Sequence, residues 1–116
     1  MIQLMTDMTT EYRENMRGGQ GTIAITNIFK KNDFKANCRL CAQITIQPGD
    51  SIGFHEHVNE EELYLIIQGK ALVNDNGHEK ELHAGDAILT GNGTGHAIQN
   101  IGLQPLELIA IILVYA

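Results

Sequence analysis

Apolar residues occupy every second position between residues 39 and 46, and charged, polar or cysteine side chains fill the positions between them. A period of two is typical of a β-strand with two unlike faces. From Thr22 onward, short runs rich in Ile, Val, Leu and Thr alternate with turn residues. We therefore predict strands over residues 22–29, 39–46, 51–57, 62–68, 71–75, 78–83, 87–90, 95–101 and 106–115.

Turns rich in glycine separate these runs. Asn76-Gly77 is the strongest hairpin signal, because both residue types favour the positive φ of a two-residue type I′ turn. Residues 91–95 contain three glycines and predict a loop. Many short strands, with no helix of normal length after the first 21 residues, predict an all-β sandwich or barrel.

The first 21 residues differ in composition from the rest of the chain, since they are polar, contain methionines and end in Gly18-Gly19-Gln20-Gly21. We interpret residues 1–21 as an N-terminal arm with a helical turn around residues 10–16. The arm is either a partly ordered tail or a segment packed on a partner subunit. Residues 22–116 then form a single β-domain, because a chain of 116 residues can bury one core without staples.

The last predicted strand is apolar on both faces, because nearly every residue after Glu107 is Leu, Ile, Ala or Val. One face can pack inside the domain, but the other also needs a cover. An open apolar patch of that size is unusual on a monomer. The pattern therefore predicts a homodimer, with the arm or an edge strand crossing to the partner.

The charge and composition argue against a protein that binds nucleic acid, binds or spans a membrane, or is secreted. A net charge of −6 and a pI of about 5.2 disfavour binding to nucleic acid or to an anionic membrane. The N-terminus has no signal-peptide pattern, and the apolar run 106–116 is too short to cross a bilayer. Cys38 and Cys41 form a CxxC pair in a segment that enters a strand, where a redox or zinc role is disfavoured. Free thiols fit a cytoplasmic protein.

Candidate chemistry lies between Gly49 and Gly69. His55 and His57 are two residues apart in a predicted strand, so their side chains point the same way and can bind one divalent ion. Glu62 begins a buried run, where a carboxylate is costly unless something neutralises it. Three histidines, with His96 as the third, and one carboxylate suit Mn, Fe, Ni, Zn or Cu better than Ca or Mg.

The spacing of these residues resembles the two sequence motifs of the cupin family. The first motif is matched by Gly49, His55, His57, Glu62 and Gly69, and the second by Gly85, Gly93, His96 and Asn100. Gly91 stands where the second motif usually has a proline. The resemblance implies a double-stranded β-helix, the jelly-roll barrel of RmlC-like cupins, with an N-terminal arm. It also implies one divalent metal, Mn, Fe, Ni or Zn, held by His55, His57, Glu62 and His96.

Further polar residues near the motifs have roles that the sequence leaves less defined. Tyr64 follows Glu62 by two residues on the same face, so it is a candidate catalytic residue that holds substrate or passes a proton; the alternative is a core aromatic. Asn100 is interpreted as structural, as the resemblance implies. Glu60 and Glu61 are predicted to be solvated turn residues.

The predicted metal leaves two adjacent open positions and a charge near +1, which favours a small molecule that chelates through oxygen. The first hypothesis is a small metal-dependent enzyme of the dioxygenase, decarboxylase, isomerase or lyase type. The alternative is a non-catalytic module that binds a metal or a small ligand in the same pocket. Oxalate-decarboxylating cupins carry an arginine shortly before the first histidine, whereas this chain has none at residues 51–54. A strongly anionic substrate therefore lacks its expected partner.

Overall fold

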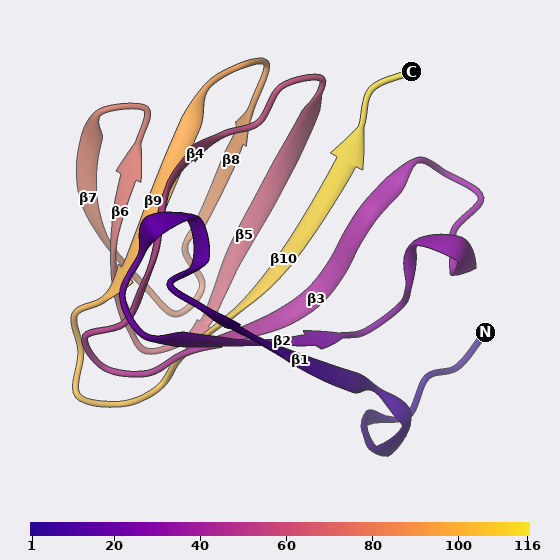
Figure 1. Ribbon diagram of the computed structural model, residues 1–116, viewed down its shortest axis with the longest axis horizontal. Helices are drawn as coiled ribbons and strands as arrows, with labels where there is room; N and C mark the ends of the chain where they lie inside the picture. The colour runs from indigo at the N-terminus through magenta and orange to yellow at the C-terminus, as the bar shows by residue number, and fades with distance from the viewer.

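The computed structural model describes all residues, Met1–Ala116, and shows an all-β protein (Figure 1). Short 3₁₀ turns lie at η1 (Met5–Asp7), η2 (Met16–Gly18) and η3 (Lys31–Asp33). The strands are β1 (Thr9–Glu14), β2 (Thr22–Asn27), β3 (Cys38–Ile46), β4 (Ser51–Glu56), β5 (Glu60–Gln68), β6 (Lys70–Asp75), β7 (His78–His83), β8 (Ala87–Gly91), β9 (Gly95–Asn100) and β10 (Leu106–Val114).

The strands form two antiparallel sheets that enclose the core. One sheet has the order β1-β2-β3-β10-β5-β8 and the other has the order β4-β9-β6-β7. From β4 to β10 the chain passes repeatedly from one sheet to the other, which is the winding of a double-stranded β-helix. Residues that face inward from β4, β5 and β9 therefore meet between the sheets. The jelly-roll class expected from the sequence is confirmed.

Side-chain alternation places the core where the sequence predicts it. Ala42, Ile44 and Ile46 of β3 are buried, and Leu108 and Ala110 of β10 pack in the same cluster. The hairpin at Asn76-Gly77 is also confirmed, because both residues have positive φ (50° and 102°) and the flanking strands pair directly. These elements were predictable because their signals are local.

Two local predictions were wrong. The helical turn expected over residues 10–16 is instead the strand β1, which pairs with β2 from Thr9↔Asn27 to Glu14↔Thr22. All side chains of β1 are exposed, so the sequence carried no periodic signal for a strand. Glu60 and Glu61 are not solvated turn residues, because β5 begins at Glu60, both residues are half-buried, and the Glu60 side chain forms hydrogen bonds.

The two cysteines form no disulfide bond. Cys38 and Cys41 are both free thiols, and burial raises the pKa of Cys38. No helix in the protein is long and apolar enough to cross a membrane.

Candidate metal centre

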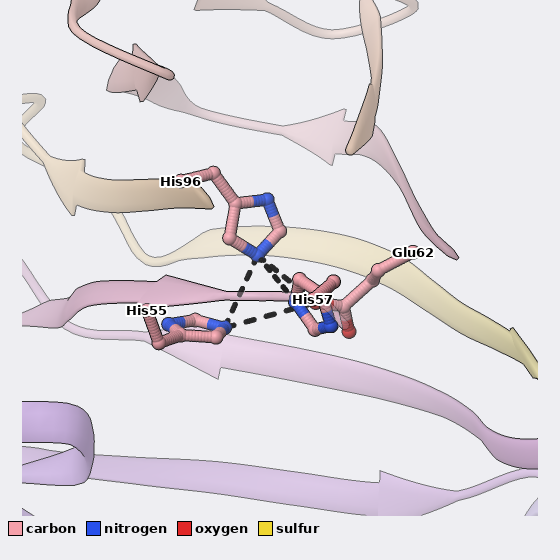
Figure 2. A group of neighbouring side chains, drawn as sticks. All are labelled: His55, His57, Glu62 and His96. Carbon is pink, nitrogen blue, oxygen red and sulfur yellow. Dashed lines mark hydrogen bonds and ion pairs between the residues drawn. The ribbon is translucent and has the colours of Figure 1, made fainter. Parts of the chain in front are cut away.

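The four metal-ligand candidates meet between the two sheets (Figure 2). His55 lies in β4, His57 directly follows it, Glu62 lies in β5 and His96 lies in β9. β4 and β9 are neighbours in which His55 pairs with His96, while β5 belongs to the facing sheet. His57, Glu62 and His96 are at most 3% exposed. The fold thus collects all four residues in one protected place.

The ligating atoms converge closely enough to share one ion. All of them lie within 4.8 Å of one another. The His96 Nε2 atom is 3.0 Å from His57 Nε2, 3.2 Å from His55 Nε2 and 3.0 Å from Glu62 Oε1. Glu62 Oε1 is also 3.0 Å from His57 Nε2 and 4.0 Å from His55 Nε2.

The other ring nitrogens determine which tautomers are present. His55 Nδ1 donates to the Gly53 carbonyl at 2.8 Å, and His57 Nδ1 donates to the Glu60 carboxylate at 2.5 Å. A neutral imidazole carries one ring hydrogen, so the Nε2 atoms of these two rings present lone pairs. His96 Nε2 lies 3.0 Å from His57 Nε2 and 3.2 Å from His55 Nε2, so one hydrogen on His96 can point at only one of these two lone pairs, whereas one cation among the three nitrogens satisfies both. The donor set therefore fits a metal ion held by Nε2 atoms.

The spacings also fit the coordination number that such an ion favours. Ligands ~2.2 Å from an octahedral ion lie about 3.1 Å apart when adjacent and about 4.4 Å apart when opposite. Four of the five spacings above are 3.0–3.2 Å, and only His55–Glu62, at 4.0 Å, approaches the longer value. Three imidazoles and one carboxylate in this arrangement suit a transition metal rather than Ca²⁺ or Mg²⁺.

Glu60 is a site residue that the sequence reasoning missed. Its carboxylate accepts a hydrogen bond from His57 Nδ1 and two more from Arg39, both at 2.9 Å. Hydrogen bonding to Arg39, with a further contribution from His57, lowers the pKa of Glu60. The side chain is 14% exposed, so this contact is shielded from water. The sequence did contain one indication of this role: Glu60 lies two residues before Glu62, so the two side chains share one face of a strand.

The charges and hydrogen bonds around Glu62 keep it ionised. Burial opposes its ionisation, but hydrogen bonds and charge from His57 and His96 outweigh burial and lower the pKa to about 2. Hydrogen bonding to Glu62 raises the pKa of His57, whereas desolvation lowers the pKa of His55.

Tyr64 packs against His96 and lines the same cavity as His55, His57 and Glu62. Its ring stacks on His96 with centroids 4.6 Å apart and planes 14° apart, and it is 2% exposed. Burial, followed by the negative charge of Glu62, raises the pKa of its phenol well above the usual value, and the positive charge of Arg17 acts in the opposite direction. Tyr64 is thus a neutral hydroxyl beside the candidate metal centre.

Asn100 has a different environment. Its side-chain amide donates to the carbonyl oxygens of Ile46 and Gln104, and its side-chain oxygen accepts from the Gly102 amide, all at 2.8 Å. These contacts join β9 to the turn before β10 and to the end of β3. They agree with the structural interpretation of Asn100.

A cavity of about 70 Å³ adjoins the centre. Its lining includes His55, His57 and Glu62, together with Met16 and Arg17 from the N-terminal segment. A larger hollow of about 430 Å³ lies beside Lys31 and Val114 and contains none of the four ligand candidates. The small cavity is therefore the one that bears on chemistry, and it admits only a small molecule.

Comparisons with known proteins agree with this geometry. The cupin domain family matches residues 42–112, a segment that contains the four ligand candidates. The chain is 35% identical to "Oxalate-binding protein" of Thermotoga maritima over 113 residues, which cover 97% of this chain and 93% of that protein. A crystal structure described as a "predicted oxalate decarboxylase" from the same organism superposes with a TM-score of 0.94 at 35% identity, covering 98% of this chain and 99% of that one.

A second kind of relative is larger. Oxalate decarboxylase OxdC of Bacillus subtilis is 32% identical over 99 residues, which cover 81% of this chain but 25% of that protein. The similarity to OxdC therefore concerns one part of a longer chain.

Proposed function

We propose, from the premise that this chain belongs to the cupin domain family, that it binds one divalent transition metal and, on that metal, a small molecule that chelates through oxygen. The metal ligands are His55, His57, Glu62 and His96. The observation that carries the proposal is the convergence of three Nε2 atoms and one carboxylate oxygen within 4.8 Å. Mn, Fe, Ni and Zn all suit this donor set.

The chelator is proposed to be a small dicarboxylate of the oxalate type. Neutral histidines and one carboxylate leave about one positive charge on a divalent ion, so an anion is favoured. Four protein ligands on a six-coordinate ion leave two adjacent positions for two oxygen atoms. The cavity of about 70 Å³ has room for a ligand of this size. Two relatives have names that mention oxalate, which supports the same class.

The first candidate activity is that of a small metal-dependent enzyme of the dioxygenase, decarboxylase, isomerase or lyase type. When bound, the metal would act as a Lewis acid toward the ligand oxygens. Glu62 would hold the ion and lower its net charge. Tyr64 offers a neutral hydroxyl beside Glu62 that can hold a substrate oxygen or move a proton at its phenolic oxygen.

The second candidate is a non-catalytic module that binds the ligand without changing it. The name of the Thermotoga maritima relative favours this candidate. Incubation of the Mn²⁺-loaded protein with oxalate separates the two. Loss of oxalate with formation of product supports an enzyme, and Tyr64→Phe should then slow turnover without changing metal content. Tight binding with no loss of oxalate supports the binding module.

Both candidate functions require a bound metal ion, and a measurement of metal content tests this requirement. Protein purified without added metal and then exposed to Mn²⁺ should bind one ion per chain, and His57→Ala should remove most of it. His78→Ala is the matched control, since His78 is exposed and lies in β7, away from the four ligands. Equal metal content in His57→Ala and His78→Ala would refute the proposed site.

We also propose that the protein forms a homodimer through the outer face of the larger sheet. Ile109 of β10 pairs with Leu65 of β5, and Ile111 pairs with Leu63, which in turn pairs with Leu89 of β8. Leu65 is 39% exposed and Leu89 is 62% exposed, while Leu63, Ile109 and Ile111 are half-buried, so an apolar strip that crosses three strands is partly open to solvent. A second copy of the chain is the cover that the strip requires.

A further inference from the structure

The turn that carries Arg17 is built into the wall of the metal pocket. We define the strap as residues 15–21, which connect β1 to β2. The strap is closed by a hydrogen bond from the Asn15 amide to the Gly21 carbonyl at 2.8 Å. It is fastened to β4 by reciprocal bonds of 2.9 Å, in which the Ser51 amide donates to the Gln20 carbonyl and the Gln20 amide donates to Ser51 Oγ.

Two glycines make this contact close. A Cβ atom at Gly53 of β4 would collide with the carbonyl oxygen of Arg17, and one at Gly19 would collide with the carbonyl oxygen of Ser51. The backbones of strap and strand therefore touch directly, two residues before His55. The position of the strap over the pocket is thus fixed by the same strand that carries a metal ligand.

Arg17 has a backbone conformation that is unfavourable for any residue with a Cβ atom. Its φ is 55°, in the left-handed region where glycine is most at ease and where a Cβ atom causes strain. The next residue of the turn, Gly18, also has positive φ and is a glycine, so the turn accommodates glycine. Strained backbone of this kind concentrates at ligand sites, where the surrounding structure holds it. This observation suggests that the arginine side chain has a use at position 17.

Arg17 is also the arginine in the cavity wall that has no partner. Three arginines contribute to the lining, namely Arg13, Arg17 and Arg39. Arg13 pairs with Glu11 at 3.3 Å and Arg39 pairs with Glu60 at 2.9 Å. Arg17 forms no ion pair and no side-chain hydrogen bond, although its charge reaches Tyr64 inside the pocket. Arg17 is exposed and lines the cavity, so its guanidinium is free to bind an anion there.

We propose that Arg17 is the substrate-binding residue that selects a dicarboxylate at this centre, by pairing with the carboxylate oxygens that face away from the metal. A guanidinium matches a carboxylate with two parallel hydrogen bonds. This inference rests on the proposed function, because it needs a ligand on the metal. It also supplies the cation that is missing from residues 51–54, since the strap brings an arginine to the pocket from another part of the chain.

Calorimetric titration of the Mn²⁺-loaded protein tests the proposal, with oxalate as the dianion and glycolate as a monoanion of similar size. Arg17→Gln should weaken oxalate binding by at least about tenfold, the loss of one charge-assisted pair. It should weaken glycolate binding much less and leave Mn²⁺ affinity unchanged. Arg13→Gln is the comparator, since it removes the same charge from the same cavity but from an arginine already paired with Glu11.

Arg17→Gly separates the side chain from the fold. Glycine relieves the left-handed strain at position 17, so this variant should be at least as stable to heat as the wild type. It should nevertheless lose as much oxalate affinity as Arg17→Gln. A stable Arg17→Gly protein with wild-type oxalate affinity would overturn the proposal, and so would an equal loss in Arg13→Gln.

The failure of this inference differs from the failure of the proposed function. If the wild-type protein binds Mn²⁺ but no oxalate, the dicarboxylate function is wrong and the role of Arg17 falls with it. If the wild type binds oxalate and the Arg17 variants bind it equally well, only the role of Arg17 is wrong. A proportionate loss for oxalate and glycolate would refute selection between dianion and monoanion.

Discussion

Glu60→Gln should weaken metal binding although Glu60 is not itself a ligand. The substitution keeps the shape of the side chain but replaces a carboxylate with a neutral amide opposite His57 Nδ1, 2.5 Å away. It also removes the charge that two hydrogen bonds from Arg39 hold in place. His57 is then less firmly oriented and its Nε2 atom is a weaker donor to the metal.

The magnitude follows from the kind of bond that is lost. A hydrogen bond to a charged group contributes about 1.5–3 kcal/mol and a neutral one about 0.5–1.5 kcal/mol. The exchange therefore costs about 1–1.5 kcal/mol, which corresponds to roughly a fivefold to thirteenfold change in a dissociation constant. Partners of metal-bound histidines commonly change metal affinity by about 10–100-fold. We expect a loss of about tenfold.

Competition with a fluorescent Mn²⁺ chelator at pH 8 measures this loss, since protons compete little with the metal at that pH. Glu61→Gln is the matched control, because it removes an equal charge one residue along the chain from a side chain without an ion pair or hydrogen bond. If Glu60→Gln and Glu61→Gln bind Mn²⁺ equally well, the contact between Glu60 and His57 has no part in metal binding.

Three further predictions concern pH, stability and assembly. The pKa of His57 is raised above its usual value of 6.5, so protons should compete with the metal for this ligand and Mn²⁺ affinity should fall as pH drops below that raised pKa. The gain in melting temperature from Mn²⁺ should then shrink between about pH 8 and 5, and an equal gain at both ends would contradict this. Asn100→Ala should lower the unfolding free energy of the metal-free protein in urea by about 2–4 kcal/mol, because it removes three hydrogen bonds, one of them buried and two part-buried; a change below about 0.5 kcal/mol would refute the structural role. Leu65→Glu should yield a folded monomer in sedimentation where the wild type sediments as a dimer, and a wild-type monomer at micromolar concentration would remove the basis for this variant.

The strands and the convergence of the four ligand candidates were largely predictable because their signals are short-range. Alternation in β3 and the Asn76-Gly77 turn each lie within a few residues, and the histidine and glutamate spacing adds a resemblance to a known family. β1 escaped detection because both of its faces are exposed, so no alternation marked it. Its pairing with β2 depends on the turn at residues 15–21, which no local pattern describes.

The surroundings of the site were not predictable for a related reason. Glu60 stands in an acidic run that looks solvated, and only the arrival of Arg39 from β3 shows that its carboxylate is held. Arg17 reaches the pocket through backbone contact between the strap and β4, which depends on Gly19 and Gly53 lying together. Such contacts join distant segments, and a single sequence contains no spacing that reports them.

A crystal of the protein grown with Mn²⁺ and measured near the manganese absorption edge tests the central claim most directly. The anomalous difference map should show one strong peak per chain, about 2.0–2.3 Å from Nε2 of His55, His57 and His96 and from a carboxylate oxygen of Glu62. Strong peaks elsewhere, or none between these four side chains, would contradict the account of this centre.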